Sequence, residues 1–199
     1  TKPVHPAELV AHIKALLART RSHPTPLPVI QRGYSVGLLG CKGGLGVSTL
    51  ALNLAASYAR KTKNEVIAAE LRPGQGTWGP ELGISDSDGL DSLLKMNPVE
   101  INMGEVDKYL VNTSFGVRLL LAGSNSLNLN FSGMTDRLLA LVNSLTLLTP
   151  MCFIDIGTPF LPGYEKVCSI CRELIIVLDA LPSTVTRTKA LLHELRSGS

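Results

Sequence analysis

Several features are scarce in this 199-residue sequence, and each scarcity narrows what the protein can be. Charged residues make up only 18% of the chain and the net charge is +3, so there is no strong signal for binding nucleic acid or an acidic membrane. No run approaches 18 uncharged apolar residues, so we expect no transmembrane segment. The first ten residues lack the apolar stretch of a signal peptide, and we expect none.

Cysteine is also scarce, with four residues spread along the chain: Cys41, Cys152, Cys168 and Cys171. Disulfide frameworks need denser, paired cysteines, so a reducing, cytoplasmic location fits best. Hydrophobic residues, in contrast, make up 45% of the sequence, which is typical of a globular protein with a sizeable core. The length allows one domain, or one domain plus a fragment.

The first 33 residues divide into two segments. Apolar residues recur at helical spacing in HPAELVAHIKALLART, which predicts a helix over residues 6–19. Three prolines follow within RSHPTPLPVIQRG, and proline at that density prevents a helix. We therefore predict a linker over residues 20–33.

From residue 34 onward, strand patterns alternate with helix patterns. The expected strands are 34–41, 64–71, 116–123, 151–157 and 173–180. The expected helices are 48–62, 89–96, 104–111, 134–149 and 183–196, the last opened by a Ser183 cap. This alternation predicts an α/β fold, a mostly parallel twisted sheet with helices on both faces, which binds ligands at the carboxyl ends of its strands.

The stretch GCKGGLGVST, residues 40–49, is nearly a phosphate-binding loop. The usual loop reads G-x-x-x-x-G-K-[ST], in which backbone amides and a lysine contact the phosphates and a hydroxyl holds Mg²⁺. Gly46 and Ser48 match, whereas Cys41 and Val47 stand at the first glycine and the lysine. Because the loop lies between a predicted strand and a predicted helix, we expect a phosphate site; the alternative is a tight turn that binds no ligand.

The segment KGGLGVSTLALNLAASYA resembles the deviant phosphate loop of the ParA/MinD family, K-G-G-x-G-K-[ST]-T followed by an apolar helix. The resemblance spans about residues 34–196 and implies ATP and Mg²⁺ as cofactors. It implies that Lys42 reaches across a homodimer interface to the partner's ATP, as a catalytic residue. The implied nucleotide-binding residues are Lys42, Gly43, Gly44, Leu45, Gly46, Val47, Ser48 and Thr49. Val47 departs from the family's second lysine.

Within that family the chain is most similar to the TadZ/CpaE pilus-assembly group, which often lacks the second lysine. The group carries a receiver-like N-terminal domain, and residues 1–19 resemble the end of a response-regulator receiver; an ordinary amphipathic helix is the alternative. The ParA-like domain is then residues 34–199. The family's adenine-recognising segment is expected beyond LLHELRSGS, which leaves open a domain truncated at its C-terminus.

Two further family motifs are altered in this sequence. In AELRPGQGTWG, which resembles D-x-D-P-Q-x-G, Glu70 and Arg72 replace the two aspartates. The resemblance makes Glu70 a candidate catalytic residue, but its longer side chain predicts slow hydrolysis; the alternative is a strand-end carboxylate at a solvated edge. Arg72 could neutralise phosphate in place of the missing lysine. Trp78, just beyond, we expect to pack.

The second altered motif is CFIDIGTPF, residues 152–160, which resembles the family's D-x-p-P segment. It implies that Asp155 holds Mg²⁺ together with Ser48, and an aspartate inside an apolar strand is costly to bury unless it is paired or metal-bound. Asp179 we interpret as a simple strand-end carboxylate.

Three functions follow from these patterns. The first is an atypical ParA-like ATP-binding protein, a weak ATPase at best, that dimerises and places Tad-type pilus or secretion machinery, recruited from the cytoplasm to the cell pole or inner-membrane face. The second is a pseudo-ATPase scaffold without nucleotide, favoured by Val47, Glu70 and Arg72. The third is a ParA/MinD-type partitioning ATPase, which requires steady turnover.

Overall fold

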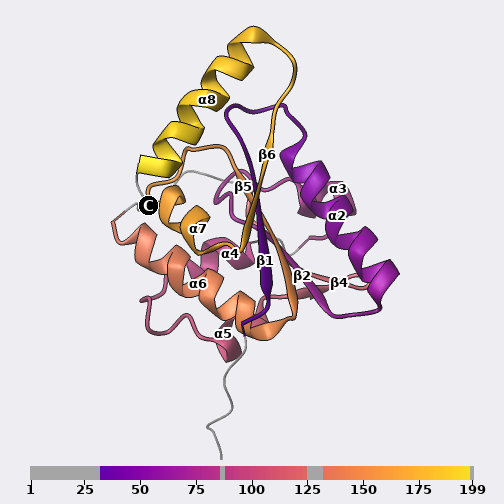
Figure 1. Ribbon diagram of the computed structural model, residues 1–199. Helices are drawn as coiled ribbons and strands as arrows, with labels where there is room; N and C mark the ends of the chain where they lie inside the picture. Colours follow the sequence, from indigo (N-terminus) through magenta and orange to yellow (C-terminus); the bar gives the residue numbers. More distant parts are fainter. Residues whose placement is uncertain (1–31, 86–87, 125–131, 198–199) are drawn as a thin grey trace, which may run out of the picture. The chain divides into compact units, whose positions relative to one another are not determined.

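The computed structural model describes residues 32–85, 88–124 and 132–197, and element labels follow Figure 1. The receiver-like helix predicted over residues 6–19 and most of the predicted linker lie outside these ranges. Of the predicted linker, only Arg32 and Gly33 are described, and both are hydrogen-bonded to α6 (Met134–Leu148). Arg32 Nη1 donates to Asn143 Oδ1 at 2.7 Å, and the Gly33 amide donates to the Thr146 carbonyl at 2.6 Å. Both residues therefore contact α6 directly.

A six-stranded sheet forms the centre of the described domain, in the order β3-β4-β2-β5-β1-β6. Every neighbouring pair is parallel except β3 with β4, so the predicted mostly parallel α/β sheet is confirmed. The strands are β1 (Tyr34–Gly40), β2 (Val66–Glu70), β3 (Val111–Asn112), β4 (Val117–Leu120), β5 (Met151–Gly157) and β6 (Glu173–Val177).

Helices cover both faces of the sheet (Figure 1). One apolar cluster joins the sheet to α2 and α3, and a second joins it to α4 through α8. The helices are α2 (Val47–Thr62), α3 (Trp78–Leu82), α4 (Gly89–Leu93), α5 (Met103–Lys108), α6 (Met134–Leu148), α7 (Tyr164–Ile170) and α8 (Pro182–Ser197). The predicted two-sided layering is confirmed.

Helix α2 owes its close fit on the sheet to small residues at helical spacing. Ala51, Ala55 and Ala59 lie four residues apart on its buried face, and each side chain is a single methyl group. The helix can therefore approach β1, β2 and β5 closely. This contact fixes the start of α2 beside the carboxyl ends of β1 and β5.

The structure differs from the local predictions in several places. The helix expected over 104–111 ends at Lys108, because Val111 already pairs with β4 as an edge strand. Helix α8 begins at Pro182, one residue before the expected Ser183 cap, because proline suits the first position of a helix. The short helix α3, which the sequence pattern did not predict, forms around Trp78, a fully buried side chain.

Candidate phosphate and cation site

The glycine loop follows β1 and leads directly into α2, as predicted. Gly44 and Gly46 both have a left-handed backbone, with φ of +78° and +79°, which turns the chain tightly between strand and helix. Gly46 is the N-cap and supplies no side chain to cap the helix, and the first turn of α2 contains no acidic residue. The amides of the first turn have no carbonyl acceptor within the helix, so this end of α2 favours an anion.

The residues predicted to bind nucleotide differ in their exposure to solvent. Gly43, Gly44, Gly46 and Thr49 are exposed, and a methyl group added at any of the three glycines would meet no atom of the described residues within 4 Å. Leu45 is half-buried against the apolar cluster under α2. The loop is therefore open for a ligand to approach its backbone.

Val47 stands where the family's second lysine would lie. Its side chain is only 7% exposed and belongs to the apolar cluster between α2 and the sheet. The side chain therefore serves the core and offers no charged group to a phosphate.

The early lysine is held by an ion pair within the chain. Lys42 Nζ lies 3.0 Å from Oδ2 of Asp179, just beyond the end of β6, and the Lys42 side chain is 29% exposed. The Thr184 hydroxyl and the Lys42 ammonium both lower the pKa of Asp179, which keeps it ionised. Asp179 is thus more than the simple strand-end carboxylate inferred from the sequence, because it is the partner of Lys42.

Glu70 is fully buried at the end of β2, so the alternative of a solvated edge carboxylate is wrong. Its Oε1 accepts hydrogen bonds from the Thr77 amide at 2.7 Å, the Thr77 hydroxyl at 3.3 Å and the Trp78 amide at 3.4 Å, and its Oε2 accepts from the Ala122 amide at 3.3 Å. Burial raises the pKa of Glu70, and these amides oppose the rise. In this arrangement Glu70 fastens the loop after β2 to the end of β4.

Trp78 is packed, as expected, and also ties two parts of the site together. Its indole Nε1 donates to the Ser48 carbonyl at 3.2 Å. The loop after β2 is therefore attached to the first turn of α2.

Arg72, from the loop after β2, reaches across the site to both predicted magnesium ligands. Its Nη1 donates to Ser48 Oγ at 2.6 Å and lies 3.8 Å from Oδ2 of Asp155. Asp155 is fully buried in β5; its Oδ1 accepts from the Gly157 amide at 2.9 Å, and its Oδ2 has no hydrogen bond to any residue that the structure describes. Burial raises the pKa of Asp155, while the nearby Ser48 hydroxyl and the Arg72 guanidinium oppose the rise.

A magnesium ion fits this arrangement poorly. Mg²⁺ needs oxygen ligands at about 2.0–2.1 Å in octahedral geometry, but a guanidinium nitrogen already lies against Ser48 Oγ. Groups of three or more potential metal-binding side chains are absent from the described residues. The structure thus places Ser48 and Asp155 close together, with the cationic Arg72 side chain within 4 Å of both.

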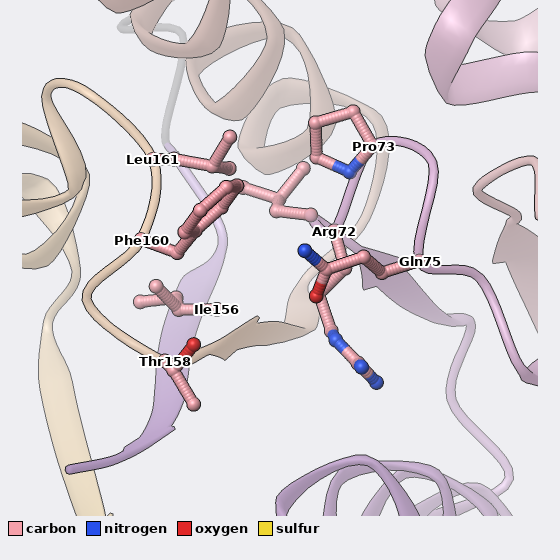
Figure 2. A pocket seen from close by; sticks show the side chains of 8 residues that line it. Arg72, Pro73, Gln75, Ile156, Thr158, Phe160 and Leu161 are labelled. Atoms are coloured by element: carbon pink, nitrogen blue, oxygen red, sulfur yellow. The ribbon is translucent and has the colours of Figure 1, made fainter. Parts of the chain in front are cut away.

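A small half-open pocket lies beside this arginine, between the loops that follow β2 and β5 (Figure 2). It encloses about 220 Å³, open solvent at its mouth included. Figure 2 shows the Arg72 side chain running away from Phe160 and Leu161, the apolar wall of the pocket. The guanidinium therefore belongs to the glycine-loop side.

Comparison with known proteins supports the fold. No family model matches the sequence, and no curated protein matches it. Among solved structures, a ParA family ATPase from Chlorobium tepidum superposes with a TM-score of 0.63 at 18% identity, covering 80% of this chain and 66% of that one. The cell division ATPase MinD from Pyrococcus furiosus gives 0.63 at 18%, covering 83% and 68%. The chain has the ParA/MinD-like P-loop fold.

The same fold also occurs in another neighbour, the kinase domain of the Escherichia coli tyrosine kinase ETK, with a TM-score of 0.66 at 15% identity, covering 96% of this chain and 70% of that one. The chain spans about two thirds of the ParA structure's length. In the described ranges of this ParA/MinD-like domain, no helix has the length and apolar character needed to span a bilayer.

Two contacts of the site were missed by sequence reasoning. The Lys42–Asp179 pair joins residues 137 positions apart, and the Arg72–Ser48 bond joins residues 24 apart. The one available signal for the second was the charge reversal at Arg72, beside a loop that lacks its lysine.

Proposed function

We propose that this chain is a nucleotide-binding protein of the ParA/MinD type, whose bound phosphates contact residues 42–49 and the first turn of α2. The observation that carries the proposal is the uncapped, acid-free start of a 16-residue helix at the carboxyl edge of the sheet, with Lys42 and Arg72 beside it. Backbone amides and a helix terminus bind phosphate without a P-loop lysine.

In the resting site we expect slow unstimulated hydrolysis. Both carboxylate oxygens of Glu70 accept hydrogen bonds from the protein itself, and the side chain is fully buried. A general base must lie within hydrogen-bond reach of the attacking water. Glu70 can take its proposed catalytic role only if the loop after β2 rearranges.

The biological role that the comparisons support best is that of a ParA/MinD-type partitioning or positioning ATPase, acting as a homodimer when nucleotide is bound. A second candidate is the localisation factor of a Tad-type pilus or secretion machinery. It is favoured by the burial of Val47, since the TadZ/CpaE group, which this sequence resembles, often lacks the second lysine. The pseudo-ATPase scaffold remains the third outcome of the test.

The first experiment measures ATP binding by calorimetry and mass by light scattering, with Mg²⁺ and with EDTA in separate runs. We expect binding, an ATP-dependent dimer and little phosphate release while no DNA or lipid is added. Lys42→Ala should remove the dimer; Lys61→Ala, an exposed lysine in the last turn of α2, is the control and should leave it intact. Absence of heat, mass change and thermal shift with ATP in both runs would favour the scaffold.

Phosphate release then separates the two cellular roles. Steady turnover stimulated by DNA or lipid supports partitioning, whereas an ATP-dependent dimer without turnover supports the localisation factor. Co-purification with pilus-assembly proteins would further support the latter.

A further inference from the structure

The Arg72 guanidinium lies where the P-loop fold usually places a divalent metal. In P-loop NTPases a hydroxyl from the loop and an acidic residue from a neighbouring strand hold Mg²⁺. Here the corresponding oxygens belong to Ser48, in the first turn of α2, and to Asp155, in β5. The same Arg72 Nη1 lies 2.6 Å from the first and 3.8 Å from the second.

A second feature shows that the fold makes room for this arginine. Gly157 has a left-handed φ of +71°, and a methyl group placed on it would lie 2.9–3.1 Å from Arg72 Cδ, Nε and Cγ. Only a glycine at this position leaves space for the arginine stem to cross the end of β5. The path of Arg72 to Ser48 is therefore built into the loop after β5 as well as into the loop after β2.

The guanidinium still has donors for a ligand. It carries five N–H groups, and within the described residues only Nη1 has a hydrogen-bond partner. The side chain is 23% exposed, so part of it is open to solvent. Arginine binds phosphate oxygens through paired N–H groups. The usual P-loop lysine does not occupy this space, because position 47 carries a buried valine.

We propose that Arg72 replaces Mg²⁺, so that this site binds the phosphate chain of a nucleotide without a divalent metal. The proposal rests on the proposed nucleotide-binding function and adds that this binding does not require a divalent cation. The buried oxygen Asp155 Oδ2, which has no hydrogen bond among the described residues, then serves to hold the arginine rather than a metal.

Calorimetry with ATP, in excess Mg²⁺ and in EDTA, tests the proposal on the unmodified protein. We expect dissociation constants that agree within about threefold in the two buffers. Binding in Mg²⁺ that falls tenfold or more in EDTA would overturn the proposal while leaving nucleotide binding intact. No binding in either buffer would overturn both the proposal and the function on which it rests.

Two arginine variants give an independent readout. Arg72→Ala should weaken binding in EDTA at least tenfold, and Mg²⁺ should restore part of the loss because Ser48 and Asp155 are freed. The matched control is Arg118→Ala, whose side chain is 24% exposed against 23% for Arg72 and is also ion-paired, with Asp107. It should bind as the unmodified protein does in both buffers; melting curves of both variants check that they fold.

The proposal would be wrong if Arg72→Ala bound ATP in EDTA as tightly as the unmodified protein does. Arg72→Lys keeps the charge but lacks the paired donors, so its ATP affinity in EDTA should lie between those of Arg72→Ala and the unmodified protein. Pyrophosphate as an alternative probe should show the same insensitivity to EDTA, because the proposed contact is to phosphate and not to the base.

Discussion

Lys42 Nζ and Asp179 Oδ2 lie 3.0 Å apart, joining the glycine loop to the end of β6 within one chain. The family resemblance assigns this lysine to a partner's ATP, so the ion pair must break before such a dimer forms. Asp179→Asn removes the competing charge, and we expect the ATP-dependent monomer–dimer equilibrium to move toward dimer by several-fold. Light scattering over a concentration series measures the shift; an unchanged equilibrium would mean that Lys42 does not act across the interface.

Glu70→Asp restores the family's aspartate but shortens the side chain by one methylene. The shorter carboxylate cannot keep its contacts with both Thr77 and Ala122. Leaving buried amides without acceptors costs about 1–3 kcal/mol each, so we expect a loss of stability of that order in urea unfolding. Phosphate release by this variant should not increase. A rise in turnover without destabilisation would instead assign Glu70 the catalytic role.

The buried Glu70 carboxyl should also make the stability of the fold depend on pH. Burial raises the pKa of Glu70 above its ordinary 4.5, so the folded state binds this proton more tightly than the unfolded state does. Its contribution to stability is therefore greatest below pH 4.5 and is lost as pH rises through the folded pKa.

Glu70→Gln does not titrate and isolates this effect. We expect the stability advantage of the unmodified protein over this variant to shrink as pH increases above 4.5. Unfolding free energies of both proteins at several pH values measure it. An advantage that grows with pH would mean that the amides of Thr77, Trp78 and Ala122 outweigh burial.

Gly157→Ala should destabilise the domain through both its backbone and its neighbour. A left-handed alanine costs roughly 1–2 kcal/mol, and its methyl group would also collide with Arg72. Gly116→Ala is the matched control, because its φ is +81° but the nearest atom lies 3.9 Å away. We expect Gly157→Ala to lose more free energy of unfolding than the control.

A double-mutant cycle assigns the difference to Arg72. Gly157→Ala combined with Arg72→Ala should cost less than the sum of the single variants, with a coupling of about 0.5–3 kcal/mol. Additive effects would show that the arginine stem does not occupy the space beside Gly157.

The sequence was most informative where the local pattern and the tertiary packing agree. Helix α2 and strand β5 were placed within one residue, because the apolar period of the first and the continuous apolar run of the second match their burial. The short helix α3 was not predictable, since its residues WGPEL contain glycine and proline and it forms around a buried tryptophan.

The sequence motifs led to the residues of the candidate site but not to their partners. Lys42, Ser48 and Asp155 were identified from motifs, whereas the ion pair of Lys42 and the position of Arg72 depend on how separate strands bring their ends together. Likewise, an acidic residue at the end of β2 gives no sign in the sequence of whether it meets water or four protein donors.

The two cations beside the glycine loop are each matched by a carboxylate of the same chain, Lys42 by Asp179 and Arg72 by Asp155. Their fields therefore largely cancel a few ångströms outside the protein, and a distant polyphosphate is hardly steered toward the loop. Capture depends on random encounter followed by short-range contact with the amides, so the association rate should change little with ionic strength.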